Sequence, residues 1–240
     1  KDNHFFNVLA THDGIGLRPV GDILNNYEIN LIIENVKKRD GIISYKSEKD
    51  GSKTPYEMNI TYFDALQDFE NSDEKNIDKF VAAHAILLSI QGFPALYFHS
   101  LFGTRNYKEG FKETGLPRTL NRRKFGYNEI DALLQNESSH ESQVFRKISN
   151  MLKIRRKYSA FHPNSPQKII KLSDNIFSII RGNVEPILIL INISGSEDYV
   201  KLPLEYSNLR LNIFDNSIRE NQIELKAFEV VWLKRVNKSA

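Results

Sequence analysis

The chain has 240 residues, of which 40% are hydrophobic and 26% are charged, values typical of a globular protein. It contains no cysteine, which excludes disulfides and thiolate metal sites. No apolar run approaches the roughly 20 residues that a membrane-spanning helix needs. The net charge of +3 comes from short basic clusters, which we interpret as solvated helix ends and loop rims. We expect a cytoplasmic protein that binds neither nucleic acid nor membrane.

The N-terminal segment predicts a strand followed by a tight turn. Phe5–Leu9 is a short apolar run that we expect to be buried, and Thr11–Gly14 closes it with a glycine that permits a sharp backbone path. The first residue is Lys1. A chain that begins inside a core strand is expected to be a fragment of a longer protein. Further on, the polar segment Lys46–Thr54 predicts a mobile loop.

Two helices and one further strand are expected in the middle of the chain. Apolar residues recur at three- and four-residue steps over residues 73–90, which predicts a helix whose apolar face includes His84. Phe93–Phe98 is nearly continuous in apolar residues, as in a parallel strand buried on both faces. A second helix is expected from about Glu141 to Lys157, with Ser138 and Glu141 forming a capping box.

The pattern changes near Ser159. Before it, strands and helices alternate, as in the unit from which (β/α)8 TIM barrels are built. After it, short strands follow at close spacing, and Trp232 lies in one of the apolar runs, where we expect it to be core. We predict the C-terminal portion of a (β/α)8 barrel in residues 1–160, with an inserted loop at 25–58, and a small antiparallel β domain in residues 161–240.

The candidate for chemistry is His12-Asp13-Gly14, at the C-terminal end of the first expected strand. In a barrel, that end of the strands carries the catalytic groups. A bare Asp-Gly pair is more often only a turn, so the surrounding residues decide.

Those residues resemble a known family. Phe6–Pro19 is similar to the fourth signature region of the α-amylase superfamily, and more narrowly to its sucrose phosphorylase branch. Four further segments resemble the branch in the same order: residues 55–63, 92–98, 103–106 and 118–122. The resemblance covers the whole chain and weakens after about residue 165. Tyr107 departs from the aspartate that the branch commonly has there.

The resemblance implies roles for individual residues. Asp13 matches the carboxylate that stabilises the transition state by binding the 2-OH and 3-OH of glucose. His12 matches a histidine that contacts the same hydroxyls. Arg118 matches an arginine near the 4-OH, although a structural salt bridge remains the alternative for it.

The segment Tyr56-Glu57-Met58-Asn59 matches the acceptor-site loop of the branch. It resembles glucosylglycerate and glucosylglycerol phosphorylases more than sucrose phosphorylases, so we expect Tyr56, Glu57 and Asn59 to contact an acceptor other than fructose. The alternative is that Glu57 is a solvated loop acid. The candidates for phosphate or for an anionic acceptor are Arg18, Arg105 and Arg122.

The reaction implied by the resemblance is double displacement with retention, in which phosphate accepts glucose from an α-glucoside and releases α-glucose 1-phosphate. In the family, the nucleophile and the general acid precede the His-Asp motif. We therefore expect this chain to need the N-terminal half of the same enzyme, to be inactive alone, and to expose apolar surface.

Other functions stay open: a sucrose phosphorylase, an amylase-type hydrolase or transglucosylase, and a non-catalytic sugar-binding module. We expect no cofactor and no metal, since no His/Asp/Glu cluster has ligand spacing. A His99-Ser100-Asp13 triad is not expected, because the Gly-x-Ser-x-Gly elbow is missing.

Overall fold

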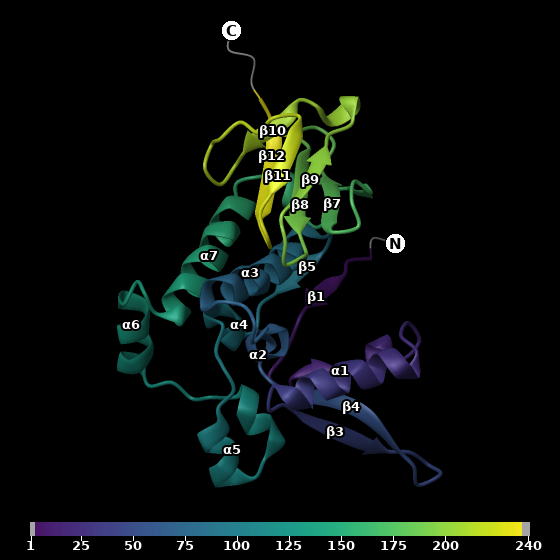
Figure 1. Ribbon diagram of the computed structural model, residues 1–240, viewed down its shortest axis with the longest axis vertical. Coiled ribbons are helices and arrows are strands. Elements are labelled where there is room, and N and C mark those ends of the chain that lie inside the picture. Colours follow the sequence, from purple (N-terminus) through teal and green to yellow (C-terminus); the bar gives the residue numbers. More distant parts are fainter. Residues whose placement is uncertain (1–2, 237–240) are drawn as a thin grey trace. The chain divides into compact units, whose positions relative to one another are not determined.

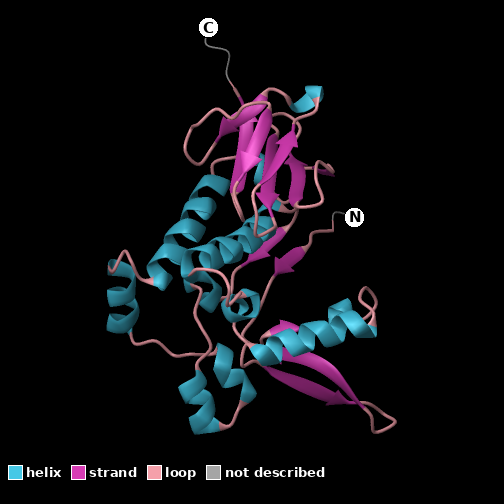
Figure 2. Cartoon of the chain, viewed as in Figure 1, coloured by secondary structure: helices cyan, strands magenta, loops and turns pink. Residues whose placement is uncertain are grey.

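The computed structural model describes residues 3–236. This part of the chain divides into two compact units that alternate along the sequence. The first unit combines residues 3–7, 72–95 and 146–236, and the second combines residues 8–71 and 96–145. Both units contain helices and strands (Figures 1 and 2).

The helices are α1 (Asn26–Lys38), α2 (Tyr62–Leu66), α3 (Asp73–Ser89), α4 (Phe98–Phe102), α5 (Lys108–Thr114), α6 (Tyr127–Gln135) and α7 (His140–Arg155), with 3-10 turns η1 (Arg18–Val20), η2 (Pro117–Asn121), η3 (Ser159–Phe161) and η4 (Leu204–Tyr206). The strands are β1 (Phe6–Val8), β2 (Ile15–Gly16), β3 (Ile42–Ser47), β4 (Lys53–Asn59), β5 (Phe93–Ala95), β6 (Gln167–Ile169), β7 (Ile176–Arg181), β8 (Ile187–Asn192), β9 (Asp198–Lys201), β10 (Leu209–Asn212), β11 (Gln222–Leu225) and β12 (Val230–Arg235).

The second unit is built on a three-stranded antiparallel sheet in the order β2-β4-β3. Helix α1 lies along this sheet (Figure 1) and starts at a capping box, in which Asn25 and Glu28 bond each other's backbone N–H. Apolar side chains from α1, from β4 and the residue after it, and from the residue before η1 form the core between them: Leu17, Ile33, Val36, Met58 and Ile60. This core fixes β4, the strand that carries Tyr56, Glu57 and Asn59.

The expectation of a mobile loop over residues 46–54 is wrong at both of its ends. Lys46 pairs with Thr54 and Ser47 with Lys53, so only the hairpin tip lies outside the strands. The far end of a hairpin is exposed on both faces, and its polar composition therefore looks like that of a loop.

The first unit contains a five-stranded antiparallel sheet in the order β10-β12-β8-β7-β6 and a smaller sheet of β9 and β11. All six residues of β8 are buried, and Trp232 on β12 is fully buried against Phe161 and Phe214, which confirms it as core. Strand β11 alternates between exposed and buried residues, but only Ile223 and Leu225 in it are apolar, so its sequence indicates a strand only weakly.

The two expected helices are confirmed as α3 and α7. The cap of α7 differs from the prediction by one residue: the Oγ of Ser139, and not that of Ser138, accepts the backbone N–H of Ser142 at 3.1 Å. Ser138 instead donates its hydroxyl to the side chain of Asn136.

The expected burial of the first strand and of residues 93–98 is wrong for this chain. β1 pairs with β5 in a two-stranded sheet, and Phe5, Phe6 and Phe93 are 68%, 75% and 48% exposed. Strand β5 ends at Ala95, and Phe98 begins helix α4. Each strand has one neighbour among the described residues, so the apolar side chains face solvent. The prediction that this chain exposes apolar surface is thereby confirmed.

His84 lies on the buried face of α3, as expected, with its Nδ1 2.9 Å from the carbonyl oxygen of Phe80. Burial lowers the pKa of His84 to about 4 from an ordinary value of 6.5. Below the ordinary value the unfolded chain binds a proton that the folded chain does not. The contribution of neutral, buried His84 to the free energy of unfolding is therefore complete above about pH 6.5, and it is lost as the pH falls toward 4.

We predict that His84→Gln flattens the acid side of the stability profile. The pKa shift corresponds to about 3 kcal/mol of unfolding free energy lost in the wild type between pH 6.5 and 4. Urea denaturation at about pH 7 and pH 4.5 measures it, with the exposed His162→Gln as control. Identical pH dependence in His84→Gln and wild type would contradict the prediction.

Candidate active site

The turn that presents Asp13 depends on Gly14. Thr11 and Gly14 exchange two backbone hydrogen bonds of 3.0 Å. Gly14 has a φ of 114°, and a Cβ there would lie 2.2 Å from the carbonyl oxygen of Met58 on β4. Only glycine fits this backbone conformation and this close approach. The turn therefore packs directly against the strand that carries Glu57.

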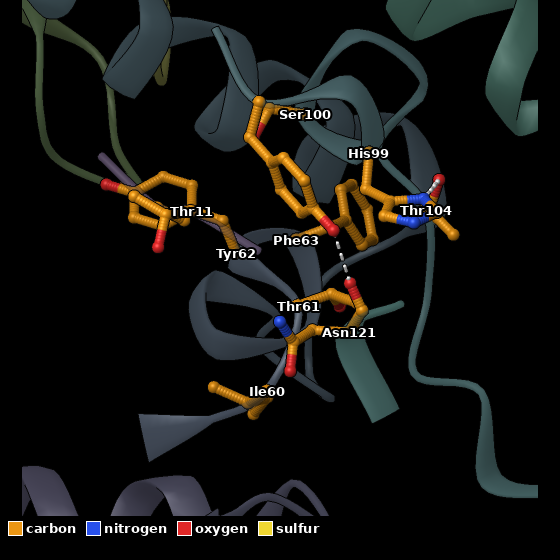
Figure 3. A pocket seen from close by; sticks show the side chains of 11 residues that line it. Thr11, Ile60, Thr61, Tyr62, Phe63, His99, Ser100, Thr104 and Asn121 are labelled. Carbon is orange, nitrogen blue, oxygen red and sulfur yellow. Dashed lines mark hydrogen bonds between the residues drawn. The ribbon is translucent and has the colours of Figure 1, made fainter. Parts of the chain in front are cut away.

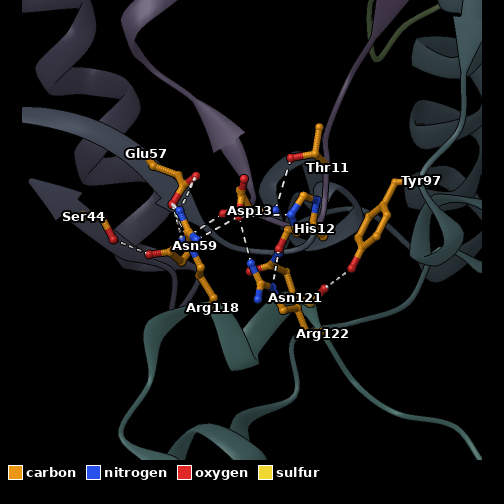
Figure 4. Close-up of polar contacts among 10 residues, drawn as sticks. All are labelled: Thr11, His12, Asp13, Ser44, Glu57, Asn59, Tyr97, Arg118, Asn121 and Arg122. Atoms are coloured by element: carbon orange, nitrogen blue, oxygen red, sulfur yellow. Dashed lines mark hydrogen bonds and ion pairs between the residues drawn. The ribbon is translucent and has the colours of Figure 1, made fainter.

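Two arginines from η2 and the residue after it hold the Asp13 carboxylate (Figure 4). The Nη1 of Arg118 is 2.9 Å, and the Nη2 of Arg122 2.8 Å, from the same oxygen, Oδ1. Among residues 3–236, no hydrogen bond or ion pair is formed by the other oxygen, Oδ2. The side chain is 37% exposed, so Asp13 is fixed by charge-assisted bonds on one side and open on the other.

Glu57 is buried beneath Arg118. Its side chain is 8% exposed, and its Oε2 accepts bonds of 3.2 Å from both the Nε and the Nη2 of Arg118. The alternative that Glu57 is a solvated loop acid is therefore wrong. Arg118 bridges two carboxylates, those of Glu57 and Asp13, so the salt bridge considered for it is present.

Asn59 joins Glu57 to the turn. It is fully buried, and its Nδ2 donates to the Oε2 of Glu57 at 3.1 Å and to the backbone oxygen of Asp13 at 3.0 Å. Its Oδ1 accepts the hydroxyl of Ser44 on β3 at 2.6 Å. Because both acceptors lie on one side and the Ser44 hydroxyl on the other, the orientation of the amide is determined.

A second amide and Arg122 hold the residue before Asp13. The Nδ2 of Asn121 donates to the backbone oxygen of His12 at 2.9 Å, and the Nε of Arg122 donates to the same oxygen at 2.6 Å. The hydroxyl of Tyr97 donates to the backbone oxygen of Asn121 at 3.0 Å. Burial raises the pKa of Tyr97, with Asp13 acting in the same direction and Arg122 in the opposite one.

The structure brings together most of the sequence-predicted site residues, namely Asp13, His12, Glu57, Asn59, Arg118 and Arg122. The His12 side chain is 68% exposed, with its Nε2 3.5 Å from the Oδ1 of Asp13. Tyr56 is 39% exposed on β4, and its backbone oxygen bonds the N–H of Leu17.

Two of the predicted arginines have other neighbours. Arg105 stacks on Phe63 at 5.1 Å and has its Nη1 3.8 Å from the Oδ1 of Asp64, a carboxyl whose pKa is raised by burial. Arg18 is exposed on η1 and is among the charges that lower the pKa of Glu48, after the larger effects of Thr54 and Lys46.

A small cavity of about 10 Å³, room for roughly one water molecule, adjoins the site (Figure 3). Asn121 and His99 line it, and the Nδ1 of His99 lies 3.1 Å from the Oγ1 of Thr104. Burial, reinforced by Arg123, lowers the pKa of His99 to about 4. His99 is therefore neutral at neutral pH, with a threonine as its partner.

Within residues 3–236, no group of three or more His, Asp or Glu side chains is arranged to hold a metal ion. The helices of the same residues include none that is long and apolar enough to cross a membrane.

Sequence reasoning did not assign three residues that the site uses, Ser44, Tyr97 and Asn121. Asn121 lies within residues 118–122, a segment that resembles the family, so the resemblance could have indicated it as a site residue. Ser44 had none, because its role depends on the pairing of β3 with β4, where it faces Glu57.

The fold is shared with a solved enzyme structure. The crystal structure of sucrose 6F-phosphate phosphorylase from Thermoanaerobacter thermosaccharolyticum matches 78% of this chain and 36% of that one, with a TM-score of 0.66 at 22% sequence identity. No protein-family model matches the chain.

The sequence relatives of the chain include glucosylglycerate phosphorylases and a sucrose phosphorylase. The chain is 36% identical to glucosylglycerate phosphorylase from Escherichia coli over 96% of its own length and 41% of the relative's. It is 40% identical to glucosylglycerate phosphorylase from Spirochaeta thermophila over 95% of its length and 42% of the relative's. Sucrose phosphorylase from Agrobacterium vitis is 30% identical over 65% of the chain and 31% of the relative.

The expected resemblance to the sucrose phosphorylase branch, and within it to glucosylglycerate phosphorylases, is confirmed. The chain spans about two fifths of the length of the glucosylglycerate phosphorylases it matches.

We predict that Gly14→Ala lowers the free energy of unfolding by about 2 kcal/mol or more, because the new Cβ meets the Met58 carbonyl in a strained backbone conformation. Gly51→Ala is the matched control. Gly51 has a φ of 84° but open space around it, so it carries the conformational strain without the clash. Chemical denaturation of both variants compares them, and equal losses would contradict the packing argument.

Proposed function

We propose that this chain is the C-terminal part of a retaining glycoside phosphorylase that transfers glucose from a glucosylglycerate-like α-glucoside to phosphate. The observation that carries the proposal is the Asp13 carboxylate, with Oδ1 held by Arg118 and Arg122 and Oδ2 open. The identity to two glucosylglycerate phosphorylases over at least 95% of the chain supports it.

The proposal includes the architecture. We assign β1 and β5 to the last two strands of a (β/α)8 barrel whose other strands come from the rest of the protein. Residues 1–160 are then the barrel portion, with the acceptor-site loop at 25–58, and residues 161–240 the β domain. The exposed Phe5, Phe6 and Phe93 support this assignment, because closing the barrel would bury them.

The reaction proceeds in two displacements. A carboxylate from the rest of the protein attacks the anomeric carbon, the glycosidic C–O bond breaks, and a general acid protonates the leaving oxygen. A phosphate oxygen then displaces the carboxylate from the same carbon and forms α-glucose 1-phosphate, while the acid regains its proton from phosphate.

Asp13 acts on the sugar in both steps. Positive charge builds up at the anomeric carbon and the ring oxygen as each bond breaks. A fixed carboxylate that accepts hydrogen bonds from the 2-OH and 3-OH stabilises that charge without reorganising. The open Oδ2 of Asp13 and the exposed His12 are suited to these hydroxyls.

Glu57 and its neighbours determine the charge that an acceptor meets in the site. Both oxygens of Glu57 face donors from Arg118, and Oε2 also faces Asn59, so its negative charge is compensated within the protein. An anionic acceptor or phosphate then meets the exposed part of Arg122, and Tyr56 offers a partly exposed side chain on β4. Arg18 and Arg105 remain more distant candidates for the anion.

The test is an assay of the full-length protein that contains this sequence, with glucosylglycerate, glucosylglycerol and sucrose, each with and without phosphate. We expect glucose 1-phosphate release to be fastest from glucosylglycerate. Asp13→Asn should lower kcat about 100-fold or more, whereas the exposed Asp174→Asn should leave kcat unchanged. The chain of 240 residues alone should release none.

Each alternative has its own outcome. Sucrose as the best substrate would refute the assignment of the acceptor, and turnover independent of phosphate would indicate a hydrolase or transglucosylase. Sugar binding without turnover would indicate a non-catalytic module. Full activity in Asp13→Asn would remove the central residue of the proposal.

A further inference from the structure

The peptide that joins His12 to Asp13 is held on three sides. Its oxygen accepts from Asn121 and Arg122, its N–H donates to the Oγ1 of Thr11 at 3.1 Å, and the next backbone oxygen, that of Asp13, accepts from Asn59. A peptide is planar, so fixing its oxygen and its N–H fixes the direction from which the chain enters Asp13. The orientation of the Asp13 carboxylate therefore depends on these hydrogen bonds.

Asn121 is the buried member of the pair that holds the His12 oxygen. It is 2% exposed, whereas the side chain of Arg122 is 38% exposed and also binds the Oδ1 of Asp13. The backbone oxygen of Asn121 is itself anchored by Tyr97. Burial and this anchor hold the amide of Asn121 more firmly than the partly exposed guanidinium of Arg122 is held.

The two ends of the Asn121 amide differ in their contacts. The Oδ1 of Asn121 is buried and accepts no hydrogen bond from residues 3–236. The amide cannot be turned round, because its oxygen would then face the His12 oxygen. The hydrogen bond to the His12 oxygen is therefore the one that this amide makes among residues 3–236.

We propose that Asn121 is a positioning residue for Asp13, acting through the His12 oxygen to hold the carboxylate in the direction that the reaction requires. The inference rests on the proposed function. It adds a residue that does not contact substrate yet controls kcat, since small misplacements of a catalytic group slow the chemical step.

The test compares Asn121→Asp with the wild type in the full-length protein. The substitution keeps the shape but replaces the donor with a carboxylate oxygen facing the His12 oxygen. We expect kcat for phosphorolysis to fall about 10- to 100-fold, with KM changed little because the lost effect belongs to the transition state. The ratio of variant to wild-type kcat should rise as the pH falls, because a protonated carboxyl can donate to the His12 oxygen again.

Asn192→Asp is the matched control. Asn192 is fully buried, and its Nδ2 also donates to backbone oxygens, those of Ser196, Leu225 and Lys226, in the other unit. It should lose stability without losing kcat or changing the pH profile. If circular dichroism shows Asn121→Asp to be unfolded, kcat is measured in Asn121→Ala instead. That substitution removes the donor without adding charge.

The possible results distinguish the proposed role of Asn121 from the proposed function. Loss of kcat in the Asn121 variants but not in Asn192→Asp supports the inference. Wild-type kcat in both Asn121→Asp and Asn121→Ala overturns it and leaves the proposed function intact. A wild-type protein without phosphorolytic activity overturns the proposed function, and the inference falls with it.

Discussion

The ion pair between Glu57 and Arg118 is the interaction on which the rest of the site depends. Glu57 carries a carboxylate whose side chain is only 8% exposed, and an unpaired charge at such a position would be strongly unfavourable. Arg118 must therefore lie over Glu57, and in that position its Nη1 reaches Asp13 at 2.9 Å. Two carboxylates and two guanidinium groups, with Arg122 as the second, form a cluster whose formal charges cancel. In the proposed function, this compensation lets a phosphate or an anionic acceptor approach without meeting the charge of Glu57.

Backbone contacts also fix the position of Asp13. The absence of a side chain at Gly14 lets the turn approach the Met58 carbonyl, and the donors of Asn59 and Asn121 hold the oxygens on either side of Asp13. These contacts come from β4 and η2, elements that are far from the turn in sequence. The site is thus assembled by packing within one unit, with no metal ligand set among the described residues. A preorganised carboxylate of this kind is what stabilisation of a developing positive charge requires.

Local patterns predicted helices α3 and α7, most antiparallel strands after residue 159 and the core position of Trp232, because apolar periodicity reports directly on burial. They did not predict helix α1 or the pairing of β3 with β4 within residues 25–58. They overestimated the burial of Phe5, Phe6 and Phe93, since hydrophobicity does not tell whether a covering partner lies in the same chain. The motif resemblance proposed Asp13, Arg118 and Glu57 as site residues, but the pairing between them was not predictable from spacing. That Glu57 is buried under Arg118 follows from the β3–β4 register and from η2, both of which are tertiary features.

The exposed sheet of β1 and β5 and the two-fifths coverage of the relatives support the proposal that a longer protein completes the active site. The most direct test is therefore a crystal structure of the full-length protein with glucose bound. The account predicts that the Asp13 carboxylate lies within about 3 Å of two adjacent glucose hydroxyls, with Arg118 still paired to Glu57. Glucose bound away from Asp13, or an Asp13 side chain turned away from the sugar, would contradict it.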